Sequence, residues 1–159
     1  MKLSTKGRYA VTAMVDLAKV SLASDDGTAP VSLAEIAARQ GISTSYLEQL
    51  FGRLRRAGLL ESTRGPGGGY RITRDILTVS ISEIVGAVGE GVDVTRCHGA
   101  ADCQEGTQCL THDLWSELSN QIDDYLREIT LASLVERADI RRLADAQDTR
   151  ASLISTRHL

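Results

Sequence analysis

Residues 32–60, SLAEIAARQGISTSYLEQLFGRLRRAGLL, decide the fold, because they hold two short amphipathic helices joined by a tight turn. Ser32 and Glu35 have the spacing of a capping box, which predicts the start of the first helix. Gly41 is expected to end that helix as a left-handed cap. Ser43 is the predicted N-cap of the second helix, and Ser45 with Glu48 offers another capping box one turn later. The arrangement is typical of a helix-turn-helix.

The segments on either side extend this motif to a winged helix. A helix is predicted over residues 5–23 from the helical spacing of its apolar side chains. After the helix-turn-helix come two strand-like segments, 59–64 and 70–73, separated by GPGGG at 65–69. This pattern predicts a β-hairpin. The expected fold class is mainly α, a winged helix-turn-helix with a small β-hairpin wing.

The second half of the chain is expected to contain a short helix over 78–90, a cysteine-rich loop and a long C-terminal helix over 111–129. The long helix has an apolar stripe with spacings of 3 and 4 residues: Leu114, Leu118, Ile122, Tyr125 and Ile129. A dimer partner is the simplest cover for this stripe. The alternative is that the helix folds back on residues 5–23.

Charge is distributed unevenly between the two halves. Residues 1–74 contain 11 Lys and Arg against 6 Asp and Glu, whereas residues 75–159 contain 7 against 15. A basic half favours a polyanionic partner at one end of the molecule, although a chance asymmetry is the alternative. The sequence has no apolar run of the about 18 residues that a membrane span needs, and no signal peptide is recognisable. We therefore expect a cytoplasmic protein without membrane contact.

Three polar residues on the solvent face of the second helix are candidates for contacts with DNA bases. In this motif the second helix lies in the major groove, with its N-terminal residues near the base edges. Gln49 suits adenine, Glu48 suits the N4 amine of cytosine, and Ser45 suits several edges. Glu48 would be repelled by phosphates unless it met a cytosine, so it would exclude many sequences. Its alternative role is to complete the capping box with Ser45.

Three arginines are candidates for contacts with the DNA backbone and the minor groove. Arg53 and Arg56 follow the base-contacting residues on the second helix and suit phosphates, which fix register. Arg64 stands where the hairpin enters its loop and suits a narrow minor groove. The alternative for the glycine-rich segment is an ordinary hairpin turn. A nucleotide-binding loop is not expected, because neither GK[ST] nor a helix follows.

The stretch CHGAADCQEGTQCLTH, 97–112, contains all three cysteines and two of the three histidines. An odd number of thiols in a reducing compartment favours a metal or redox role over disulfides. Structural zinc is one interpretation, although the two gaps of five residues are longer than usual. A metal-free thiol switch is the second. An iron–sulfur cluster is the third, and the long glycine-bearing spacers suit it. The candidate ligands are Cys97, Cys103, Cys109 and His112, with His98 as a spare.

Four segments together resemble a known family. KGRYAVTAM at 6–14, the helix-turn-helix at 33–60, RGPGGGY at 64–70 and the C-x5-C-x5-C-x2-H spacing occur in the order found in the IscR family. These are iron–sulfur cluster-dependent winged-helix transcriptional regulators of bacteria, and the resemblance covers about residues 1–135. Related nitric-oxide sensors of the NsrR type share the winged helix but differ in ligand spacing or use a carboxylate ligand.

The resemblance implies a homodimeric repressor or activator that binds double-stranded DNA. It implies one [2Fe–2S] cluster per subunit, supplied by the Fe–S assembly machinery, whose occupancy controls Fe–S assembly genes. The implied ligands are Cys97, Cys103, Cys109 and His112. The implied DNA-contacting positions are Ser45, Glu48, Gln49 and Arg64.

An enzyme is not expected, because no hydrolase triad, phosphate loop or paired acid and base lies outside the cysteine loop. A cluster-bearing electron-transfer enzyme would leave Arg64 and the glycine-rich wing without a purpose. The stronger alternative is a zinc-stabilised winged-helix DNA-binding regulator. The expected domains are a winged helix-turn-helix DNA-binding domain, a connecting helix with the cluster-binding loop, a dimerisation helix with a short following helix, and a mobile tail: 1–77, 78–110, 111–143 and 144–159.

Overall fold

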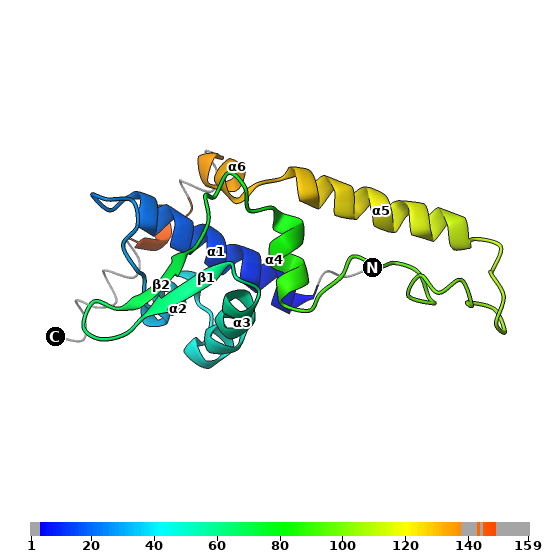
Figure 1. Cartoon of the computed structure of the whole chain (residues 1–159), viewed down its shortest axis with the longest axis horizontal. Helices are drawn as coiled ribbons and strands as arrows, with labels where there is room; N and C mark the ends of the chain where they lie inside the picture. Colours follow the sequence, from blue (N-terminus) through cyan, green and yellow to red (C-terminus); the bar gives the residue numbers. More distant parts are fainter. Residues whose placement is uncertain (1–3, 138–142, 144, 149–159) are drawn as a thin grey trace.

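The computed structural model describes residues 4–137, 143 and 145–148. Figure 1 shows a winged-helix body from which α5 and the preceding loop project to one side. The helices and strands are α1 (Thr5–Leu22), α2 (Leu33–Gln40), α3 (Thr44–Arg56), β1 (Leu60–Thr63), β2 (Gly69–Ile72), α4 (Ile81–Ala87), α5 (His112–Glu128) and α6 (Leu131–Glu136). The mainly α winged-helix prediction is therefore confirmed.

The helix-turn-helix forms as its caps predict. The hydroxyl of Ser32 accepts a hydrogen bond from the Glu35 amide, and the Glu35 carboxylate accepts one from the Ser32 amide. Gly41 ends α2 with φ 66°. Ser43 is the N-cap of α3 and accepts a hydrogen bond from the Tyr46 amide at 3.3 Å. The helix thus begins before Ser45, which leaves Glu48 without the capping role.

The position of α3 is fixed by burial of one of its faces. Its buried side chains are Leu47, Leu50, Phe51 and Leu54. They join the core with Ala10, Met14 and Leu17 of α1. Full burial of side chains of this size contributes about 1.5–3 kcal/mol each. The opposite face of α3 consequently remains directed to solvent.

A buried carboxylate fixes α2 on α1. The Asp16 carboxylate accepts hydrogen bonds from the Arg39 guanidinium, with Nη2 at 2.8 Å, and from Gln40 Nε2 at 2.6 Å. Removal of either partner would leave the buried charge under-satisfied. The angle between α2 and α1, and hence the position of α3, depends on this group.

The wing is a two-stranded hairpin extended by one residue from elsewhere. β1 and β2 are antiparallel, with Leu60 opposite Ile72 and Thr63 opposite Gly69. On its other edge β2 pairs with Val31, whose amide donates to the Tyr70 carbonyl at 2.9 Å. A Cβ at Gly69 would overlap the Val31 carbonyl, so this close approach requires glycine. The Tyr70 ring packs edge-on against Phe51, with centroids 5.1 Å apart, which ties the wing to α3.

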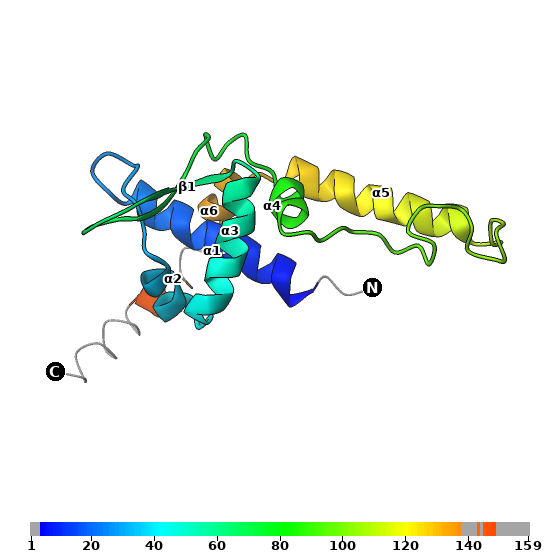
Figure 2. The same ribbon diagram turned by 60° about the horizontal axis from the view of Figure 1, so that its bottom comes forward.

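Backbone hydrogen bonds join the start of α4 to the segment between α5 and α6, where the projecting part leaves the winged-helix body. Leu131 donates its amide to the Val79 carbonyl at 2.8 Å, and Ile81 donates to the Ile129 carbonyl at 2.9 Å. α4 lies between the winged-helix body and α5 in both views (Figures 1 and 2). It is shorter than the expected 78–90 at both ends. Ser80 and Glu83 form a capping box that starts it at Ile81, and it ends at Ala87, shortly before Gly89 with φ 78°.

α5 packs against α4, and the Ser82 hydroxyl donates to Asp123 across that contact at 2.6 Å. α1 packs instead against α6, whose Leu131 and Val135 belong to the core. The structure therefore does not show α5 folded back along α1. Much of the α5 stripe remains uncovered within the chain, with Leu114 and Tyr125 each 58% exposed.

The expected mobile tail, 144–159, lies largely outside the described residues. Its described part, 145–148, contacts the body: Asp145 lies 2.7 Å and Asp148 3.5 Å from Lys19 Nζ. Within the ranges that the structure describes, no helix combines the length and hydrophobicity that a bilayer crossing requires.

Candidate nucleic-acid interface and metal centre

The predicted DNA-contacting side chains are exposed on one helix and on the wing. The exposed residues are Ser45, Glu48, Gln49, Arg53, Arg56 and Arg64. Ser45, Glu48 and Gln49 lie in the N-terminal half of α3, where a recognition helix meets base edges. Arg64 directly follows β1 at the entrance of the wing loop. The Arg55 guanidinium donates to Ser62 Oγ at 3.2 Å, which joins the end of α3 to the wing.

Arg53 has a partner inside the chain. Its Nη1 donates to the Val88 carbonyl at 3.1 Å. Val88 is the C-cap of α4, and the last carbonyls of a helix have no partner within it. The arginine that the sequence assigns to phosphate thus satisfies one of these carbonyls with one of its guanidinium nitrogens.

The cysteine-rich loop is organised around Thr95, which is buried although it lies in a loop. Its hydroxyl accepts a hydrogen bond from the Gly99 amide at 2.8 Å and donates to Asp93 Oδ1 at 2.6 Å. These bonds turn the chain sharply just before and after Cys97.

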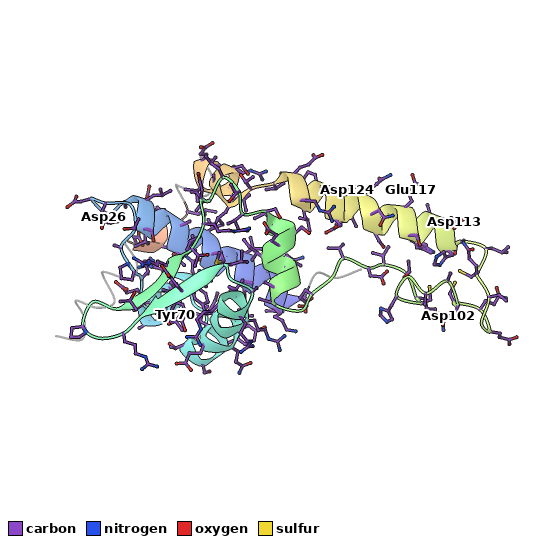
Figure 3. All side chains as sticks on the ribbon, viewed as in Figure 1. Asp26, Tyr70, Asp102, Asp113, Glu117 and Asp124 are labelled. Atoms are coloured by element: carbon purple, nitrogen blue, oxygen red, sulfur yellow. The ribbon has the colours of Figure 1, made fainter. Side chains whose placement is uncertain are left out.

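The side chains of Asp102, in this loop, and Asp113, in the first turn of α5, appear at the same end of the molecule (Figure 3).

Three of the four predicted ligands converge at the start of α5. The ligand atoms of Cys97, Cys103 and His112 all lie within 4.8 Å of one another. His112 Nδ1 is 3.4 Å from Cys97 Sγ and 3.7 Å from Cys103 Sγ. His112 is only 8% exposed. Two soft thiols and one imidazole held together in this way form a donor set suited to zinc or iron.

Cys109 is close to this group, but its sulfur is not one of the three converging atoms. Its amide donates to Cys103 Sγ at 3.1 Å, while its own Sγ is 3.9 Å from Thr111 Oγ1. Cys109, Cys103 and His112 nevertheless line one cavity of about 280 Å³.

His98, the spare candidate, does not join them. Its side chain is 90% exposed and its Nδ1 is 3.7 Å from Asp93 Oδ2. Its backbone has φ 52°, a conformation that non-glycine residues seldom adopt. The imidazole that lies beside the Cys97 and Cys103 sulfurs is that of His112.

The environment favours ionisation of two of the thiols. Burial opposes it at Cys97, but hydrogen bonds from the Ala101 backbone and the Thr95 side chain outweigh burial and lower the pKa of the thiol to about 7. A hydrogen bond from Cys103, followed by one from the Thr111 backbone, lowers the pKa of Cys109. Thiolates are the form that binds metal.

Cys103 behaves in the opposite way. The Cys109 amide favours its thiolate, yet its side-chain hydrogen bond to Cys109 and burial prevail and raise the pKa of Cys103. The three thiols therefore share hydrogen bonds within one network.

Sequence reasoning missed two residues of this site. Ser116 Oγ lies 3.1 Å from His112 Nε2, so the ring nitrogen that faces away from the sulfurs has its own partner. The spacing of four residues on a helix is a signal that could have identified Ser116. Trp115 lines the cavity, and its Nε1 donates to Thr111 Oγ1 at 3.1 Å.

Comparison with known proteins agrees with both parts of this architecture. Residues 3–137 match the model of the Rrf2 family, described as iron-dependent transcriptional regulators. The chain belongs to the Rrf2 family. The HTH-type transcriptional regulator IscR of Vibrio vulnificus is 55% identical over 148 residues, which cover 93% of this chain and 85% of that protein. IscR of Photobacterium profundum is 54% identical over 148 residues, covering 93% and 83%.

Solved structures of Rrf2 regulators share the fold. T. potens IscR superposes with a TM-score of 0.68 at 38% identity and covers 86% of this chain and 87% of that chain. CymR, the global cysteine regulator of B. subtilis, gives a TM-score of 0.70 at 31% identity, covering 85% and 96%. The chain is thus a DNA-binding transcriptional regulator of the Rrf2 family, similar to IscR, and not an enzyme.

Proposed function

We propose that this regulator senses iron–sulfur status by binding a [2Fe–2S] cluster, and that occupancy of the cluster determines which DNA sites it accepts. The observation that carries the proposal is the convergence of Cys97, Cys103 and His112 within 4.8 Å at the start of α5. The cluster would be held by these residues and by Cys109. When bound, it supplies redox- and oxygen-sensitive chemistry that the side chains lack.

The donor set fits such a cluster. Three thiols and one imidazole make four ligands, the number that a [2Fe–2S] cluster takes. The cavity of about 280 Å³ beside them leaves space for a group larger than one ion. Metal binding would draw the loop ligands together, so its free energy becomes local folding free energy of residues 97–112. The Fe–S assembly machinery is the expected donor of the cluster. Fe–S assembly genes are the expected targets, and the cytoplasm is the expected location of the protein.

Zinc is the second candidate, because Cys3His is also a zinc donor set. Anaerobic purification followed by visible absorption and by analysis of iron, sulfide and zinc separates the two. The proposal predicts a red-brown protein with two irons and two sulfides per chain, as a [2Fe–2S] cluster requires. Colourless protein that contains one zinc per chain would establish the alternative. Cys109→Ala should reduce cluster content, whereas His98→Ala should not.

The regulator is expected to act as a homodimer through α5. Leu114 and Tyr125 are exposed on the apolar stripe of this helix. Exposure of an apolar stripe to water is unfavourable and marks a surface for interaction with another protein chain. Leu114→Glu should convert the dimer to a monomer in size-exclusion chromatography with light scattering. Leu77→Glu is the control, since Leu77 is 63% exposed but lies outside α5. A monomeric wild-type protein would contradict this interface.

A dimer presents two copies of α3 to DNA. The exposed residues of α3 and the wing, Ser45, Glu48, Gln49, Arg56 and Arg64, would then contact two half-sites. Half-sites of a helix-turn-helix dimer lie about 34 Å apart or a multiple of this. The operator should therefore be a near-palindrome, which hydroxyl-radical footprinting can show as two protected segments related by a dyad.

A further inference from the structure

The contact between Arg53 and Val88 joins the recognition helix to the segment that leads to the cysteine loop. Arg53 Nη1 donates to the Val88 carbonyl at 3.1 Å. The carbonyl end of a helix carries a partial negative charge, which a guanidinium stabilises. The next residue, Gly89, has φ 78°, and a Cβ there would come within 3.0 Å of Arg53 Nη1. Arg53 is therefore the C-terminal cap of α4 supplied by another helix.

Residues 88–97 are held to three different helices. Glu90 Oε1 lies 3.4 Å from Lys6 Nζ at the start of α1. The Val94 amide donates to Ser119 Oγ of α5 at 2.9 Å. Cys97 follows three residues later. The segment thus runs from the cap at Arg53, along the body, to the first cysteine, and both views show it passing beneath α5 (Figures 1 and 2).

The position of Arg53 on α3 connects this contact to DNA recognition. Gln49 lies four residues earlier, so the two side chains share one face of the helix. Because α3 is a single packed helix, a displacement at Arg53 also displaces the turn that carries Glu48 and Gln49. A change in the path of residues 88–97 therefore has a direct physical route to the base-contacting residues.

We infer that Arg53 couples the cysteine loop to the choice of DNA sequence by capping α4, and that it is not a phosphate contact. This inference rests on the proposed cluster function. When the ligands are assembled, the backbone of residues 88–97 takes one conformation, and the hydrogen bond from Arg53 to the Val88 carbonyl fixes α3 relative to that backbone. With the ligands apart, that restraint is weakened, and α3 takes an orientation with a different preference.

The two roles of Arg53 predict different binding behaviour. The probes are the two DNA duplexes that wild-type apo and holo protein each select from a random pool, and the variants are Arg53→Ala and the control Arg56→Ala. Wild-type apo and holo proteins differ in their relative affinity for the two duplexes. Coupling predicts that Arg53→Ala reduces this difference by about fivefold or more. The dependence of affinity on salt should stay as in the wild type. Arg56→Ala should weaken both duplexes by the same factor and reduce the salt slope by about 0.9, as loss of one phosphate contact requires.

Arg53→Ala that behaves like Arg56→Ala would overturn the inference. If wild-type apo and holo proteins select the same duplexes, the proposed function fails first and the inference fails with it. Hydrogen exchange gives a readout that is independent of cluster loading. The amides of residues 89–94 should exchange faster in apo Arg53→Ala than in apo wild type, and unchanged exchange would also overturn it. Should Arg53→Ala fail to fold, Arg53→Gln, which keeps helix propensity, is measured in the same way.

Discussion

His112 lies between Cys97 and Ser116, with one ring nitrogen directed to each. Nδ1 is 3.4 Å from Cys97 Sγ, and Nε2 is 3.1 Å from Ser116 Oγ. When the Ser116 hydroxyl accepts a hydrogen bond from Nε2, the Nδ1 lone pair on the side of the sulfurs is free to bind metal, and Ser116 then helps to hold the orientation of the ring. His112 and Ser116 both belong to α5 and lie one turn apart, so the helix itself sets the position of the hydroxyl relative to the ring.

Ser116→Ala should weaken retention of the cluster. Loss of such an outer hydrogen bond typically costs 10–100-fold in metal affinity, so we expect about 10-fold faster loss of visible absorption in the presence of an iron chelator. Ser116→Thr keeps the hydroxyl and should restore the wild-type rate. Identical rates for wild type and Ser116→Ala would show that the ring needs no support from this hydroxyl.

His112→Cys should give a longer-lived cluster. An imidazole binds iron as a neutral ligand that protonation can displace, whereas a thiolate brings a negative charge to the iron. The measurement is the decay of cluster absorption in air at pH 6 and pH 8, with the larger gain over wild type expected at pH 6. His98→Cys is the control and should leave the lifetime unchanged, because His98 is 90% exposed and lies apart from the sulfurs. Equal lifetimes for wild type and His112→Cys would remove His112 from the ligand set.

Glu48→Ala should broaden the range of DNA sequences that the protein accepts. Ser43 caps α3 and Ser45 lies within it, so Glu48 has no capping role and its carboxylate is free to discriminate. A base-specific contact is worth about 1–3 kcal/mol of discrimination. Binding to duplexes that vary at each operator position should show one position where the preference for cytosine disappears. Ser43→Ala, which alters the cap and leaves the carboxylate in place, should keep that preference.

Most of the fold could be predicted because its signals are local. The Ser32–Glu35 capping box and the left-handed Gly41 depend on residues within one turn of each other. The same holds for the wing, whose glycine-rich loop separates two strand-like segments. The boundaries that shifted did so for a local reason as well, since Ser80 rather than Thr78 starts α4.

The metal centre was predicted less completely than the fold. Spacing marked Cys97, Cys103, Cys109 and His112 as candidate ligands but could not place the Cys109 sulfur, which lies near Thr111. The partner of Arg53 was beyond sequence reasoning, because the Val88 carbonyl is a backbone atom 35 residues away and no side-chain pattern marks it. Contacts between a side chain and a distant backbone leave no trace in residue spacing.

Two glycine substitutions should differ in their effect on the free energy of unfolding. Gly69→Ala places a methyl group against the Val31 carbonyl, and β2 must separate from Val31 to accommodate it. We expect a loss of about 1–3 kcal/mol, the usual range for a mutation that forces backbone movement. Gly86→Ala, inside α4 with open space around it, should be neutral or more stable by up to about 1 kcal/mol. Urea unfolding followed by circular dichroism measures both, and a stable Gly69→Ala would contradict the close approach of β2 to Val31.

The capping box of α2 should make part of the stability sensitive to acid. Hydrogen bonds from the Ser32 side chain and backbone lower the pKa of Glu35 below its ordinary value. A carboxyl whose pKa is lower in the folded state stabilises the fold above its unfolded pKa of about 4.3, and this contribution disappears as the pH falls through the folded pKa. Glu35→Ala should therefore cost about 1 kcal/mol at pH 7, and the difference from wild type should shrink as the pH falls below about 4.3. Urea unfolding midpoints measured at pH 7 and below about pH 4.3 test this prediction. Glu61→Ala is the control, because Glu61 lies on the wing strand β1 and caps no helix. A difference that stays constant or grows on acidification would show that the Glu35 charge is not what stabilises the helix start.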